Sequence, residues 1–171
     1  MLRGINVGGQ KRVGMNALKE LYESLGFSNV QTYLQSGNVV FEDGSTNLSL
    51  LIIKIEKEIK KSFGFDVLVL LRTKNELQKL VESSPFKKKD ESKLHVTFLS
   101  DKPSKIPISQ LNEARSGEEE FLISGRQIYL FCPNGYGRTK LSNNFFEKKL
   151  EVSATTRNWN TVNALLSLLS N

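Results

Sequence analysis

The spacing of apolar residues along the chain is that of a helix in some segments and of a strand in others. The order of these segments in the first half repeats in the second. In the first half the pattern predicts a strand, a helix, a hairpin of two strands, a second helix and a last strand. These elements cover residues 2–7, 15–26, 30–35, 38–42, 48–63 and 66–72, and the predicted hairpin turn is Ser36-Gly37. This order is that of the ferredoxin-like βαββαβ unit.

The same order recurs in the second half, at residues 94–99, 108–114, 119–123, 127–132, 141–150 and 151–155. The two hairpins also share local sequence, since Leu34-Gln35-Ser36-Gly37 matches Leu122-Ile123-Ser124-Gly125 at an offset of 88 residues. The prediction is therefore an α+β protein with tandem ferredoxin-like halves. The halves are residues 1–72 and 93–171, joined by a connecting helix and charged loop at 73–92. A further helix from about Asn160 is expected to close the assembly.

The strand at 66–72 contains an unbroken apolar run, Val67 to Leu71. Such a run is typical of a strand buried on both faces. The free face of each predicted sheet must be covered, and the other half is one candidate for the cover. We therefore expect a cleft between the halves, which is a common place for a ligand site.

The amino-acid composition limits the cellular location and the kinds of partner that are expected. The chain has 171 residues and a single cysteine, Cys132, so it cannot form an internal disulfide, and a cytoplasmic location is expected. No apolar run is long enough for a membrane span. The net charge is +6, and lysines and arginines outnumber acidic residues after Ser124. This charge either attracts phosphates or nucleic acid, or forms a solvated surface.

Side-chain chemistry excludes several classes of site. With one histidine and one cysteine, a Cys/His zinc site is impossible, and no acidic pair has metal-ligand spacing. No metal or cofactor is therefore predicted. His95 alternates with apolar neighbours and is interpreted as a structural histidine. No activated nucleophile pair is visible, so no catalytic residue is assigned.

The polar run from Thr155 to Thr161 is the most informative segment, because every side chain in it can form hydrogen bonds. Thr156 or Asn158 is suited to cap the last helix, and Trp159 is expected to pack in the interface between the halves. Arg157 and its polar neighbours either bind an anion or form a hydrogen-bonded clasp for that helix. Both interpretations remain open.

Three other segments place polar groups at strand ends or helix starts. The glycine pair after the first strand either brings backbone amides close to an anion or makes a tight turn. Ser36 to Asn38 forms a polar turn, and the loop at 133–140 contains two glycines and three cationic or aromatic side chains. The predicted ligand-binding residues from all of these segments are Arg3, Asn6, Gly8, Gly9, Ser36, Asn38, Lys140, Arg157, Asn160 and Thr161.

These residues favour a protein that binds a small anionic or phosphorylated ligand in the cleft between its halves. One alternative is a module that binds RNA or DNA through the basic C-terminal third. Against it, the strand at 38–42 lacks the basic and aromatic signature of sheet-based RNA binding. A second alternative is a metal-independent transferase or hydrolase that uses Lys140 or a hydroxyl group.

Three motifs together resemble a known bacterial family. They are Leu2-Arg3-Gly4-Ile5-Asn6-Val7-Gly8-Gly9, Thr32-Tyr33-Leu34-Gln35-Ser36-Gly37-Asn38-Val39-Val40-Phe41 and Thr155-Thr156-Arg157-Asn158-Trp159-Asn160-Thr161-Val162. In this order they resemble Domain of Unknown Function 1697. The resemblance implies tandem α+β units and no established activity, cofactor or catalytic residue. The family usually has a few more strand residues before Arg3, so the first strand of this chain is expected to be short.

Overall fold

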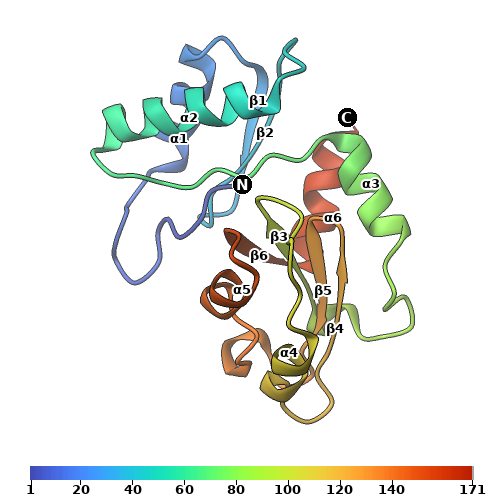
Figure 1. The fold of residues 1–171 in the computed structure, drawn as a ribbon. Coiled ribbons are helices and arrows are strands. Elements are labelled where there is room, and N and C mark those ends of the chain that lie inside the picture. The colour runs from blue at the N-terminus through green and yellow to red at the C-terminus, as the bar shows by residue number, and fades with distance from the viewer. Residues whose placement is uncertain (171) are drawn as a thin grey trace. The chain divides into compact units, whose positions relative to one another are not determined.

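The computed structural model describes residues 1–170, and it shows an α+β chain with six α-helices and two antiparallel sheets in that range (Figure 1). The chain divides into two compact units, which are described separately below. Among the described residues, the first comprises Met1–Thr73 and 167–170, and the second comprises Lys74–Leu166. Within the described residues, no helix has the length and apolar character needed to cross a membrane.

The first unit is built on a hairpin and two helices. They are α1 (Met15–Ser24), β1 (Ser28–Tyr33), β2 (Asn38–Glu42) and α2 (Leu48–Phe63). The predicted stripe on α2 is confirmed, since Leu51, Ile55 and Ile59 are buried in the core of this unit. Gly64 ends α2 because its φ of 79° is left-handed, a conformation that glycine adopts without steric cost.

The strands predicted at 2–7 and 66–72 are wrong as continuous strands. They reduce to one isolated bridge between Leu2 and Val69. The reason lies in the backbone after Arg3, where Gly4 and Asn6 have φ values of 68° and 55° and turn the chain away. The pairing is therefore limited to this bridge, and the strand is cut short after Arg3, not at its beginning as the family resemblance led us to expect.

The first hairpin also differs from its prediction. The turn is not the two residues Ser36-Gly37, because β1 already ends at Tyr33 and the chain turns over residues 34–37. Leu34 has a φ of 59° and cannot continue a strand. Gly37 has a φ of 79° and lies so close to Ile5 and Leu2 that an added Cβ would be 2.7 Å from Ile5 Cδ1. Both factors require glycine at this position.

The second unit holds a four-stranded antiparallel sheet with the order β4-β5-β3-β6. Its elements are α3 (Lys74–Glu82), η1 (Glu91–Lys93), β3 (Leu94–Leu99), α4 (Ile108–Ala114), β4 (Glu120–Ser124), β5 (Gln127–Phe131), η2 (Tyr136–Arg138), α5 (Asn143–Leu150), β6 (Ala154–Asn158) and α6 (Trp159–Leu168). The chain order from β3 to β6 is the one predicted for this half. The tandem ferredoxin-like arrangement stays a prediction, because the first unit forms only a two-stranded sheet within the described residues.

The last strand begins three residues later than predicted. It lies at 154–158 rather than 151–155, because Glu151 ends α5 in a left-handed conformation with a φ of 56°. Ala154 is the first residue of the strand and pairs with Leu99. This shift matters for the site, since Thr156 to Asn158 become part of the sheet instead of a loop after it.

Both faces of this sheet are covered. On one face, Leu99 and Ala154 pack with Leu111 of α4 and Phe146 of α5 in an apolar core. On the other face, the Tyr129 hydroxyl donates to the Leu80 carbonyl of α3 over 2.8 Å. The residues of the central strands β3 and β5 therefore alternate between two buried environments, which explains why neither strand contains an Asp, Glu, Lys or Arg.

Candidate functional site

At one end of the second unit's sheet, polar side chains replace the apolar core on the face that α5 covers. The Cα partners Thr97 and Thr156 lie on this face, as do the next pair, His95 and Asn158. Two further side chains reach this end of the sheet from η2 and from the first residue of α5. We call the group the Thr156 cluster, and its members are His95, Thr97, Tyr136, Asn143, Thr156 and Asn158.

The Thr156 hydroxyl is the centre of the cluster. It donates to Asn143 Oδ1 over 2.6 Å and accepts from the Tyr136 hydroxyl over 3.0 Å. Its oxygen also lies 2.7 Å from Thr97 Oγ1. A hydroxyl has one proton, and Thr156 uses it on Asn143, so Thr97 must be the donor in this last contact. The direction of every hydrogen bond around Thr156 is thereby fixed.

His95 stacks on Tyr136 with ring centroids 5.0 Å apart and an angle of 23° between the planes. Partial burial lowers the pKa of His95, so the imidazole is neutral at pH 7. Its Nδ1 lies 3.3 Å from the Lys93 carbonyl and donates to it in the tautomer that satisfies this contact. In that tautomer Nε2 is a hydrogen-bond acceptor.

The two asparagines of the cluster present their NH2 groups as donors. Asn143 Oδ1 is occupied by the Thr156 hydroxyl, and Asn158 Oδ1 accepts from the Thr161 amide over 2.8 Å. This second bond caps α6 and confirms that Asn158 suits the cap position. The Thr161 amide can only donate, so its contact sets the orientation of the Asn158 side-chain amide, whereas the Asn143 amide is oriented with its oxygen toward the Thr156 hydroxyl.

Arg157 does not share a face with the cluster. Side chains alternate along a strand, so Arg157 lies with Thr155 on the opposite face. Its Nη1 donates to Thr155 Oγ1 and to the Thr156 carbonyl, each over 2.8 Å. The side chain is buried, and this burial lowers the pKa of Arg157 to about 10. Both contacts lie within β6, so they do not decide between the anion-binding and the clasp interpretations of Arg157.

The other predicted residues of this unit differ in exposure. Thr161 is buried and its amide is used in the cap by Asn158. Asn160 is exposed in the first turn of α6. Lys140 is exposed on the short segment between Tyr136 and Asn143, both of which contact Thr156. Lys140 is thus four residues from Tyr136 and three residues from Asn143 along the chain.

In the first unit, Asn6 ties two of the predicted segments together. Its Nδ2 donates to the carbonyls of Val13 and Gln35 over 3.0 and 2.9 Å, and its Oδ1 accepts from the Val13 amide over 2.8 Å. The Arg3 amide donates to the Leu68 carbonyl over 2.9 Å. The Asn6 side chain thus holds the N-terminal loop against the hairpin turn.

The remaining first-unit candidates form turns. Asn38 is fully buried and donates to the Tyr33 carbonyl and to Ser36 Oγ over 2.8 and 3.0 Å, which closes the hairpin turn. Gly8 and Gly9 have φ values of 58° and 76° and connect the bridged residues Val7 and Gln10. Positive φ at both central residues is the geometry of a type I′ turn, which accounts for this glycine pair.

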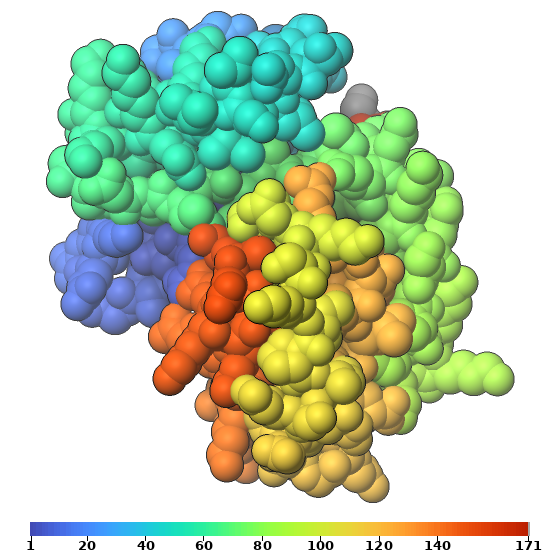
Figure 2. Space-filling view, in the orientation of Figure 1, coloured from blue at the N-terminus to red at the C-terminus, as the bar shows by residue number. Residues whose placement is uncertain are grey.

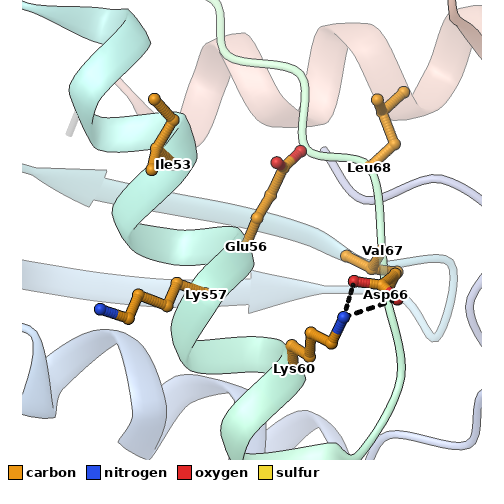
Figure 3. Close-up of a pocket in the computed structure, with 7 residues that line it drawn as sticks. All are labelled: Ile53, Glu56, Lys57, Lys60, Asp66, Val67 and Leu68. Carbon is orange, nitrogen blue, oxygen red and sulfur yellow. Dashed lines mark hydrogen bonds and ion pairs between the residues drawn. The ribbon is translucent and has the colours of Figure 1, made fainter.

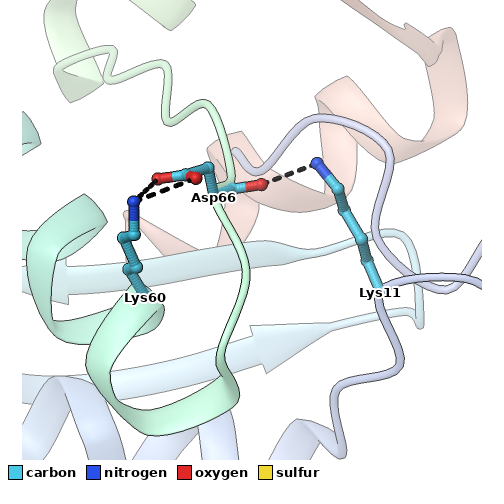
Figure 4. A network of polar contacts seen from close by, with 3 residues as sticks. All are labelled: Lys11, Lys60 and Asp66. Atoms are coloured by element: carbon cyan, nitrogen blue, oxygen red, sulfur yellow. Dashed lines mark hydrogen bonds and ion pairs between the residues drawn. The ribbon is translucent and has the colours of Figure 1, made fainter.

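The first unit also carries a shallow depression of about 500 Å³ between α2 and residues 66–68 (Figure 3). Its wall combines Ile53 and Lys57 of α2 with Val67 and Leu68. At one end of it, Lys60 forms an ion pair with Asp66 at 2.9 Å. Lys11 approaches Asp66 from the other side and donates to its backbone carbonyl over 2.6 Å (Figure 4).

Sequence reasoning missed most of the Thr156 cluster. It singled out the loop at 133–140 but did not connect Tyr136 to Thr156, and it did not select Thr97 or Asn143. Their common feature is a contact made only in the folded chain, between residues up to 59 positions apart. The one available signal was the pairing of two threonine-containing strands. Among residues 1–170, no group of three or more His, Cys, Asp and Glu side chains is arranged to hold a metal ion.

Comparison with known proteins supports a family assignment. No functionally curated protein matches the chain. Among solved structures, the chain is similar to the conserved bacterial protein SP0830 from Streptococcus pneumoniae, with 21% identity and a TM-score of 0.70. The match covers 99% of this chain and 96% of that one, so the two share their fold over nearly the whole length. The model of the family described as "Protein of unknown function (DUF1697)" matches residues 1–129, and the chain belongs to this family.

Proposed function

We propose that the protein binds a small anionic ligand, such as a phosphate ester, at the Thr156 cluster. The observation that carries the proposal is the orientation of Asn143 and Asn158, whose oxygens are both used inside the protein. Each therefore turns its NH2 group, a donor, toward a ligand. Such donors suit the oxygens of a phosphate or carboxylate.

The other parts of the cluster fit the same ligand class. His95 is uncharged, and its Nε2 is placed to accept a hydrogen bond from a hydroxyl of a phosphorylated sugar or nucleoside. Lys140 contributes a positive charge on the adjoining segment. This proposal keeps Lys140 from the sequence candidates and adds Asn143, Asn158 and His95. The cleft predicted between the halves is a different place for the ligand and is not part of this proposal, whereas the expected cytoplasmic location remains part of it.

The first experiment is a thermal-shift screen with inorganic phosphate, sugar phosphates, nucleotides and short RNA. A ligand that binds only the folded state raises the melting temperature. For short RNA, the affinity is measured at several salt concentrations, because phosphate contacts release counterions and weaken steeply with salt. A shift with RNA alone would favour the nucleic-acid alternative over a small ligand.

Asn158→Asp is the decisive variant for the best ligand. An aspartate preserves the cap on α6, since its carboxylate also accepts from the Thr161 amide, but it replaces the NH2 donor by a negative charge. A charge-assisted hydrogen bond contributes about 1.5–3 kcal/mol, so the affinity should fall roughly tenfold or more.

Asn160→Asp is the matched control. It adds the same charge two residues away, at an exposed position in the first turn of α6. If Asn160→Asp abolishes binding while Asn158→Asp does not, the ligand site is the one proposed from sequence rather than the Thr156 cluster. If neither variant changes the affinity, the donor role of this end of the sheet is refuted.

A further inference from the structure

The backbone of residues 66–71, here called the edge segment, is hydrogen-bonded as a strand on one side only. The Leu68 carbonyl accepts from the Arg3 amide, and the Leu70 amide donates to the Met1 carbonyl, each over 2.9 Å. In an antiparallel pair, the N–H and C=O of one residue point to the same side, and those of the next residue point to the opposite side. The even-numbered residues of the edge segment therefore face the N-terminal residues.

The odd-numbered residues, Val67, Val69 and Leu71, direct their backbone groups to the other side. Within residues 1–170, no strand of the first unit pairs with that side. Side chains occupy it instead, since the Val69 amide donates to Glu56 Oε1 of α2 over 2.8 Å and the Leu71 carbonyl accepts from Arg72 Nη1 over 2.7 Å. Charged side chains on the edge of a sheet are a known way to block unwanted pairing. Such side chains are also replaceable by the backbone of an incoming strand.

The depression between α2 and the edge segment lies beside these backbone groups. Figure 3 shows Glu56 reaching from the helix across to the extended chain, with Ile53 on the helix and Leu68 on the chain at the same end. Ile53 is 60% exposed, so its apolar side chain is open to a partner at this depression. An apolar wall next to unpaired strand groups is the arrangement found where proteins bind extended peptides by strand addition.

Among the described residues, some of the charged side chains that line this depression have a partner of opposite charge or a hydrogen-bond donor, and one does not. Lys60 is paired with Asp66, and Glu56 is engaged by the Val69 amide. Lys57 forms no ion pair within residues 1–170, and it projects from the same helix. The free charge beside the edge segment is therefore positive, which favours a partner with acidic side chains.

We propose that the edge segment and this depression bind an extended acidic peptide segment of another protein, added as an antiparallel strand. The partner's carbonyls and amides pair with those of Val67, Val69 and Leu71, and its strand displaces Glu56 from the Val69 amide. Alternate apolar side chains of the partner contact Ile53, and an acidic side chain contacts Lys57. This site belongs to the first unit alone and is independent of the Thr156 cluster.

The test uses the full chain and two labelled peptides of about eight residues, the length of an ordinary strand. One alternates valine with glutamate and the other alternates valine with lysine. Binding is measured by fluorescence anisotropy, and amide exchange of the protein locates the contact. The expected result is binding of the valine–glutamate peptide, with slower amide exchange at Val67 and Leu71.

Three variants complete the test, after thermal melting confirms that each is folded. Lys57→Glu should weaken the valine–glutamate peptide about three- to tenfold, because an exposed charge contact is lost and replaced by repulsion. Lys61→Glu is the matched control on the same helix and should leave the affinity unchanged, since Lys61 is paired with Glu58 and does not line the depression. Glu56→Ala should tighten binding, because it frees the Val69 amide.

Four outcomes would overturn the proposal. They are no binding of the valine–glutamate peptide, equal binding of both peptides, protection at amides outside the edge segment, or equal losses from Lys57→Glu and Lys61→Glu. Protection of Val67 and Leu71 that rises with protein concentration, without peptide, would assign the edge to a second copy of the chain and would also refute a peptide partner.

Discussion

Replacing Thr156 by valine tests the Thr156 cluster as a structural unit. Valine keeps the shape of threonine but removes the hydroxyl that forms hydrogen bonds with Thr97, Tyr136 and Asn143. Thr97 is fully buried, so its hydroxyl loses its acceptor without access to water. Tyr136 and Asn143 are half-buried, and water can replace part of their loss.

The expected loss of stability follows from this difference in exposure between Thr97 and the other two side chains. A buried hydrogen-bonding group left without a partner costs about 1–3 kcal/mol, and an ordinary hydrogen bond contributes about 0.5–1.5 kcal/mol. We expect Thr156→Val to lower the free energy of unfolding of the second unit by about 2–4 kcal/mol, a sum in which the Thr97 hydroxyl is the largest part.

The assay is urea unfolding followed by tryptophan fluorescence. Trp159 is the only tryptophan, it is buried, and it lies in the second unit three positions after Thr156. Thr156→Ser is the control, since it keeps the hydroxyl and removes one methyl group, for an expected loss of about 0.8 kcal/mol. If the two variants have the same free energy of unfolding, the hydroxyl contributes nothing and the reasoning is refuted.

Two further predictions concern one residue in each unit. Gly37→Ala should destabilise the first unit by about 2–4 kcal/mol, because it combines a left-handed backbone with contacts of 2.7–2.9 Å to Ile5 and Leu2. Gly4→Ala, with a φ of +68° and nothing within 4 Å, should cost only about 1 kcal/mol, and equal melting curves by circular dichroism would contradict the steric argument. The lowered pKa of His95 means that the unfolded chain binds a proton more readily than the folded one, so stability should fall as the pH drops below about 6.5. His95→Gln should flatten this pH dependence, and an unchanged slope would show that other groups cause it.

Residue spacing alone was enough to place the elements whose side chains follow a regular period. The stripe on α2 predicted the observed helix, because the residue spacing reflects burial of one helix face. The alternation at 94–99 predicted the strand β3, although both faces of that strand are buried. The sequence also predicted a cap for the last helix, since Asn158 directly precedes α6 and its side chain accepts from the Thr161 amide. The count of one cysteine is enough to exclude an internal disulfide, because the bond needs two.

Tertiary structure alone decided the ends of strands and the composition of the site. The left-handed Gly4 and Glu151 shorten the first strand and delay the last one, and neither conformation is visible in a hydrophobic pattern. The Thr156 cluster depends on the register between β3 and β6, which places Thr97 beside Thr156. Register follows from the packing of whole strands, so a sequence read one segment at a time cannot supply it.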